Sequence, residues 1–118
     1  MKMLDFNALN RPVLPMCMCD EAKTVITVTT PSEILVEELE TTLPELKRIV
    51  AGKDDEAVAM CYDLAARLIS CNREGLTVTV DDLRGKYWPT EKYTNMLYLV
   101  AFFNTYLDYI AEINNAKN

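Results

Sequence analysis

Histidine is absent from the chain, and glycine occurs only three times in 118 residues. Without histidine, the catalytic triads and zinc sites that use it are excluded, and the most frequent general base of enzymes is missing. The glycines, Gly52, Gly75 and Gly85, stand singly, so neither G-x-x-x-x-G-K-[ST] nor G-x-G-x-x-G occurs. We therefore expect no enzyme, no catalytic residue and no cofactor.

Carboxylate clusters are the remaining candidates for chemistry. Asp54, Asp55 and Glu56 form one cluster, and Asp81 and Asp82 form another. Each cluster stands where a helix is expected to begin, and acidic residues are favoured there by the helix dipole. A calcium-binding loop of the EF-hand kind is also missing. We expect no metal site at either cluster.

Long apolar runs are lacking as well. The longest, MLYLVAFF, covers eight residues, 96–103, whereas a membrane-spanning helix needs about 20. Near the start, Asp5, Asn7 and Asn10 interrupt the apolar stretch that a secretory signal would require. We predict a cytoplasmic protein that does not bind a membrane.

Basic residues are outnumbered, with 12 lysines and arginines against 18 aspartates and glutamates, for a net charge of −6. The excess is concentrated in residues 31–60, which carry eight acidic and three basic side chains. Such a chain repels nucleic-acid phosphates, so no nucleic-acid partner is expected. The acidic stretch is either a solvated helix face or a contact surface for a basic partner.

The four cysteines, Cys17, Cys19, Cys61 and Cys71, are spaced as C-x-C and C-x9-C. These spacings match no common zinc site. Cys17 and Cys19 would share one face of a strand, which leaves a thiolate pair or a soft-metal site as an alternative. The preferred interpretation is that the cysteines are buried, reduced and part of the core.

Residues 1–30 are predicted to form a β-hairpin. Pro12 and Pro15 exclude a helix, the polar segment 20–23 is suited to a turn, and residues 24–30 are strongly β-branched. Neither face of the second strand is clearly polar, so both are candidates for burial. An isolated hairpin is marginally stable, so it must pack on the helices or pair with another chain.

Residues 31–118 are predicted to be helical. Ser32 is expected to cap the first helix, Pro44 to break it near Thr41 and Thr42, and Thr79 to open a short helix with Asp82 in a capping box. The predicted helices are a first one beginning at Glu33 and restarting over 43–51, then 54–72, a short one after Thr79, and 90–114. The whole chain, 1–118, is predicted to be a single, mainly helical α+β domain: an N-terminal β-hairpin followed by about four α-helices.

The last predicted helix has the widest apolar surface. Tyr98, Phe102, Tyr106 and Tyr109 extend its apolar stripe around the circumference. A helix of this kind either lies in the centre of a core or is buried against another chain. Because aromatic residues dominate interface energetics, we predict these four as protein-binding anchors.

Several stretches resemble a known family. The succession LDFNALNRPVLP, TVITVTTPSEILVEELE, CYDLAARLISCNREGLTVTVDDL and FFNTYLDYIAEINNAKN is similar to the tail assembly chaperones of long-tailed bacteriophages and prophages of Gram-positive bacteria. The resemblance covers nearly the entire chain.

The resemblance implies a non-catalytic assembly factor. Such a chaperone binds the tape-measure protein and tail-tube subunits in the bacterial cytoplasm and is absent from the mature virion. The hairpin edges and the last helix would make the contacts, with a homo-oligomer as one form of the protein. The alternative is an acidic regulatory adaptor or anti-repressor that binds a basic protein partner.

Overall fold

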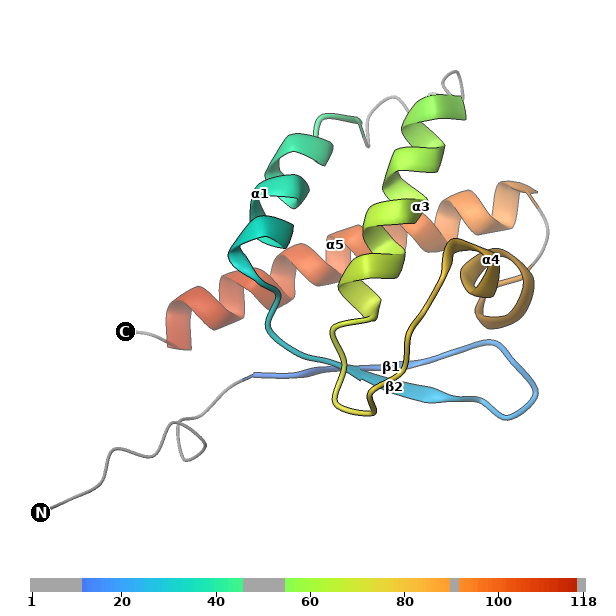
Figure 1. The fold of residues 1–118 in the computed structure, drawn as a ribbon, viewed down its shortest axis with the longest axis horizontal. Coiled ribbons are helices and arrows are strands. Elements are labelled where there is room, and N and C mark those ends of the chain that lie inside the picture. The colour runs from blue at the N-terminus through green and yellow to red at the C-terminus, as the bar shows by residue number, and fades with distance from the viewer. Residues whose placement is uncertain (1–11, 46–54, 90–91, 117–118) are drawn as a thin grey trace, which may run out of the picture.

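In a computed structural model, residues 12–45, 55–89 and 92–116 are described, and they form a two-stranded antiparallel hairpin followed by helices (Figure 1). The predicted class, a mainly helical α+β fold, is confirmed. Most of the predicted restart over 43–51 lies outside the described residues. The elements are β1 (Leu14–Cys17), β2 (Val25–Val28), α1 (Glu33–Thr42), α3 (Asp55–Ile69), α4 (Val80–Asp82), the π-helix η2 (Leu83–Tyr87) and α5 (Lys92–Ala116).

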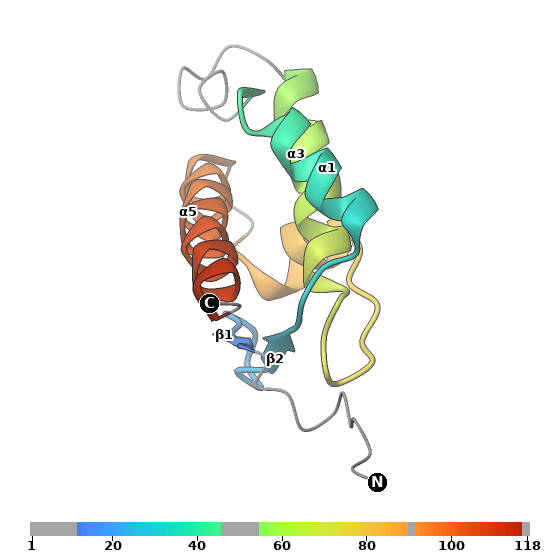
Figure 2. The same ribbon diagram turned by 90° about the vertical axis from the view of Figure 1, so that its left-hand side faces the viewer.

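The helices form two layers. Helices α1 and α3 lie side by side in one layer, α5 crosses behind them in the other, and the hairpin lies at one end (Figures 1 and 2). Helix α3 packs on both α1 and α5, so it lies at the centre of the core. That central position was one of the two alternatives predicted for the last helix. Its buried residues are Ala57, Cys61, Tyr62, Leu64, Ala65, Ala66, Leu68 and Ile69.

A chain of aromatic rings joins α3 to α5. Trp88, which follows η2, is 5 % exposed, and its ring centroid lies 6.1 Å from that of Tyr62 and 6.4 Å from that of Phe102. Along α5, Phe102 lies 5.4 Å from Tyr106, which lies 5.7 Å from Tyr109. These separations are typical of favourable aromatic pairs. The aromatic face of α5 is therefore used within the chain's own core.

Two tyrosines in this cluster differ in their hydrogen bonding. The Tyr109 hydroxyl donates to the Pro12 carbonyl oxygen at 2.8 Å, whereas the buried Tyr106 hydroxyl has no hydrogen-bond partner among the described residues. Burial raises the pKa of both hydroxyls. An unpartnered buried hydroxyl is destabilising, while a hydrogen-bonded one contributes to stability.

We therefore predict opposite effects for two matched substitutions. Tyr109→Phe is expected to lower the free energy of unfolding by about 1 kcal/mol, and Tyr106→Phe to leave it unchanged or raise it by up to about 1 kcal/mol. Urea denaturation followed by circular dichroism measures both. A loss in Tyr106→Phe as large as that in Tyr109→Phe would show that the Tyr106 hydroxyl has a partner.

One face of the hairpin packs on the helices. Met18, Ile26 and Val28 are buried, whereas Val25, on the other face of β2, is 52 % exposed. Both faces of the second strand were candidates for burial. The face that carries Val25 is exposed, so the expectation is corrected for that face. Alternation along the strand separates these two faces.

The outer edge of β2 is covered by the loop that follows α3. The Thr27 N–H donates to a Glu74 carboxylate oxygen at 2.7 Å, and the Thr27 carbonyl accepts from the Arg73 N–H at 2.9 Å. The Thr29 N–H donates to the Cys71 carbonyl at 2.8 Å. The bond from Thr27 also lowers the pKa of Glu74. This edge is not open to a further strand.

The outer edge of β1 carries a proline. The Met18 N–H donates to the Thr24 carbonyl beside the turn. The next bonded pair, Met16 with Ile26, lies two residues from the turn-side pair on each strand. Since bonded pairs alternate in an antiparallel ladder, Pro15 lies at an outward position, where it has no N–H to donate. Proline on an edge strand is a known obstacle to edge pairing. The expectation that the hairpin edges bind another chain is corrected for the edge of β2, whereas for the edge of β1 it stays a prediction that Pro15 disfavours.

Asn72 holds the loop between α3 and α4. Its side-chain amide donates to the carbonyls of Ile69 and Leu76, both at 2.8 Å, and its side-chain oxygen accepts from the Leu76 N–H at 2.9 Å. Gly75 within this loop has φ of 73°, a conformation that favours glycine. The side chain thus ends α3 and sets the path of the chain toward α4.

Candidate functional site

The four predicted anchors on α5 are placed mostly in the core. Phe102 is 4 % exposed, Tyr106 0 % and Tyr109 3 %, whereas Tyr98 is 36 % exposed. The expectation that Phe102, Tyr106 and Tyr109 present a surface to a partner is corrected, because these rings pack together and, through Phe102, on Trp88. Tyr98 stays a predicted contact residue.

The cysteines divide into two classes. Cys17 and Cys19 are exposed, which corrects the expectation that they are buried, while Cys61 is buried and Cys71 is half-buried. Burial raises the pKa of the Cys61 thiol to about 11 and also raises that of Cys71. A hydrogen bond with Cys19 raises the pKa of the Tyr98 hydroxyl.

Thiol labelling tests this division. With a neutral aromatic disulfide at about pH 8, Cys17 and Cys19 are expected to react within minutes in the folded protein, because a thiol reacts as an accessible thiolate. Cys61 should react at least about 100-fold more slowly, since it is buried and its pKa is raised. Peptide mass mapping identifies the labelled residues, and rapid labelling of Cys61 before denaturation would contradict its burial.

The described part of the chain has neither a cluster of metal ligands nor a membrane-spanning helix. No group of three or more cysteine, aspartate or glutamate side chains there is arranged to hold a metal ion. None of the helices described combines the length and the apolar character needed to cross a bilayer.

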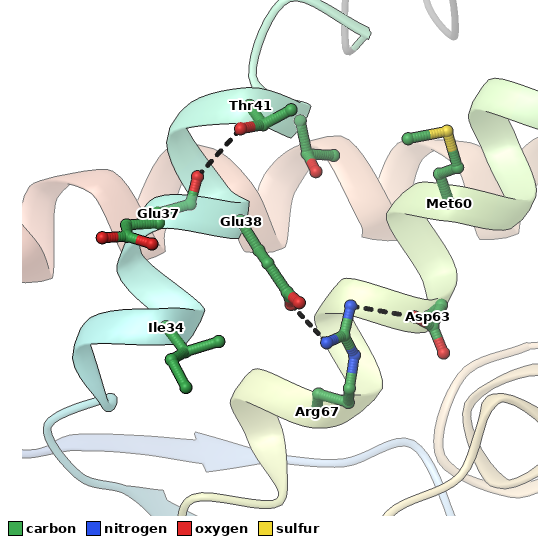
Figure 3. A pocket seen from close by; sticks show the side chains of 8 residues that line it. Ile34, Glu37, Glu38, Thr41, Met60, Asp63 and Arg67 are labelled. Carbon is green, nitrogen blue, oxygen red and sulfur yellow. Dashed lines mark hydrogen bonds and ion pairs between the residues drawn. The ribbon is translucent and has the colours of Figure 1, made fainter.

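A groove runs between α1 and α3, with a volume of about 500 Å³ (Figure 3). Both helices carry polar and apolar side chains into it. Its lining residues are Ile34, Glu37, Glu38, Thr41 and Thr42 from α1, and Met60, Asp63 and Arg67 from α3.

Two large apolar side chains stand on opposite walls of the groove. Ile34 on α1 is 69 % exposed, and Met60 on α3 is 48 % exposed (Figure 3). Single exposed apolar residues are common and need no explanation. Here the pair lines one hollow, so another chain that entered the groove would remove both from water.

Sequence reasoning missed both residues for a simple reason. Ile34 precedes Leu35 and Met60 precedes Cys61, and each of those neighbours lies on the core side of its helix. The available signal was an apolar residue one position off the core stripe in each helix. Their meeting in space depends on how α1 packs on α3, which neither pattern contains.

The groove is acidic. Arg67 of α3 reaches across it to Glu38 of α1, whose buried Oε2 atom takes Arg67 as its partner (Figure 3). The other arm of Arg67 contacts Asp63 on its own helix, with Nη2 and Oδ2 2.9 Å apart. Glu37 is exposed. Among the described residues, three carboxylates and one cation therefore line the groove, a local balance of −2 (one minus three).

The ion pairs of Arg67 are partly exposed to solvent. The side chains of Arg67, Glu38 and Asp63 are 44 %, 37 % and 61 % exposed. Pairs of this kind contribute little to stability, so they can rearrange when a charged ligand approaches.

Comparison with known proteins gives no independent assignment of the groove, because no family model, no curated protein and no solved structure matches the chain.

Proposed function

We propose that this protein is a non-catalytic tail assembly chaperone of a phage or prophage. It binds the tape-measure protein and tail-tube subunits in the cytoplasm of the bacterial host and is absent from the mature virion. The family resemblance of the sequence supports the choice of partners. The single structural observation that supports a binding role is the α1–α3 groove, where Ile34 and Met60 are both exposed.

The surface of the protein suits a chaperone for a long chain. A groove with one exposed apolar side chain on each wall contacts apolar segments of the client, while the net charge of −6 keeps the protein in solution. Each contact can be weak, because many copies on one long client act together.

Coexpression tests this function. The chain is produced together with the tape-measure protein from the same genome, and the control is an unrelated acidic protein of similar size. We expect the tape-measure protein to become soluble and to copurify with the chain but not with the control. If its solubility is the same with both proteins and nothing copurifies, the proposed function is refuted.

The acidic groove also favours a second candidate, the regulatory adaptor that binds a basic partner. An adaptor of this kind would bind a DNA-binding protein in competition with DNA, and its complex would dissociate steeply as salt is raised. A complex held by Ile34 and Met60 keeps part of its affinity in high salt, because apolar contacts are not screened. A salt titration of the purified complex separates the two candidates.

A further inference from the structure

We propose that the α1–α3 groove binds a basic amphipathic helix of its partner chain. Apolar side chains of that helix contact Ile34 at one end of the groove and Met60 at the other, and a lysine or arginine lies near Glu37. This inference rests on the proposed function and specifies which kind of client segment is recognised and where.

The charge of α1 is the first reason. Its ten residues contain Glu33, Glu37, Glu38 and Glu40 and no lysine or arginine. Glu33 lies in the first turn, where the helix dipole explains an acid, but the other three lie further along the helix. Like charges three or four positions apart on a helix, as at Glu33 and Glu37 and at Glu37 and Glu40, repel one another, so they disfavour the free protein and favour a basic ligand.

Arg67 leaves part of this charge available. Its guanidinium already contacts both Glu38 and Asp63, so one cation is shared between two carboxylates of the groove. Glu37 is the third lining carboxylate; it is exposed, and its side chain extends from α1 away from Arg67, so Arg67 does not neutralise it (Figure 3). A basic side chain from a ligand reduces the negative charge of the groove, whereas an acidic ligand would add to the repulsion.

The form of the groove favours a helix as the ligand. Both walls are helices, and α1, with ten residues, offers a wall of about 15 Å, or roughly three helical turns. A ligand that adds as a strand would instead need a free strand edge, and Glu74 and Arg73 occupy that of β2, while Pro15 disfavours pairing along that of β1. Helix-in-groove binding is the mode that suits two helical walls.

Two synthetic peptides test the inference on the full-length protein. Each has about 20 residues with leucine at i, i+3, i+4 and i+7, and their flanking positions carry lysine in one and glutamate in the other. Fluorescence anisotropy gives each dissociation constant in low salt. We expect the lysine peptide to bind at least about tenfold more tightly than the glutamate peptide. Equal binding of the two, or no binding of either, overturns the inference.

Exposed positions provide matched variants that keep the fold. Glu37→Lys is expected to weaken the lysine peptide about tenfold, whereas Glu40→Lys, on the same helix but outside the groove, changes it by less than about threefold. Ile34→Ser is expected to weaken binding about tenfold, and Leu97→Ser, at a 71 % exposed site on α5, to leave it unchanged. Equal effects within either pair would place the peptide elsewhere and overturn the inference.

The two proposals fail in different ways. If the peptides do not discriminate but the tape-measure protein copurifies, the groove inference is wrong and the chaperone function stands. If the lysine peptide binds as expected and the tape-measure protein does not copurify, the groove inference stands and the partner assigned to it is wrong.

Discussion

Replacing Phe103 with alanine is expected to lower the free energy of unfolding by about 3–5 kcal/mol, the usual cost of removing a fully buried phenylalanine. Its side chain is 0 % exposed and meets the Phe102 ring edge-on, with centroids 5.1 Å apart. Because single domains are stable by only about 5–15 kcal/mol, the variant loses a large share of its stability. Urea denaturation measures the change.

Leu97→Ala is the matched control for Phe103→Ala. Leu97 lies on the same helix but is 71 % exposed, so its truncation should change stability by less than about 0.5 kcal/mol. If the two substitutions have equal costs, the face of α5 that packs on α3 is not the one described. If Phe103→Ala leaves stability intact but weakens binding of the partner, the aromatic face is an interface, as its width in the sequence first suggested.

Asn72→Ala is expected to lower the free energy of unfolding by about 2–4 kcal/mol. Three hydrogen bonds, to the Ile69 carbonyl and to both backbone groups of Leu76, are lost together, and each is worth about 0.5–1.5 kcal/mol. The substitution also leaves the end of α3 without this side-chain cap. Thermal and urea denaturation measure the loss.

Two further variants separate the parts of this effect. Asn72→Asp keeps an oxygen that can accept from Leu76 but turns the donating amide into a carboxylate oxygen facing two carbonyl oxygens at the C-terminal end of α3, so it should be at least as destabilising as Asn72→Ala. Asn104→Ala, at an exposed position of α5, should be nearly neutral. An Asn72→Ala protein as stable as Asn104→Ala would show that the loop is held by other contacts.

The elements that depend on local chemistry were predictable from the sequence. Ser32 caps α1 by accepting from the Leu35 N–H at 3.3 Å, and Thr79 forms the predicted capping box with Asp82. Such signals involve residues three or four positions apart, so one sequence contains all the partners. The same is true of the hairpin, whose β-branched second strand is matched by β2.

The elements that depend on packing were not predictable in the same way. The apolar width of α5 did not reveal that Trp88 would cover part of it, because that contact joins a loop to a helix. Similarly, Ile34 and Met60 become a site only when α1 lies beside α3. Periodicity identifies which residues share a helix face, but it does not identify what that face meets.

The location of the partner is tested most directly by hydrogen exchange of the chain, alone and in its copurified complex with the tape-measure protein. Binding in the α1–α3 groove predicts slower amide exchange in peptides from Glu33–Thr42 and Asp55–Ile69, with Leu14–Cys17 and Val25–Val28 unchanged. Slower exchange in the two strands or in α5 alone, with α1 and α3 unchanged, would contradict it.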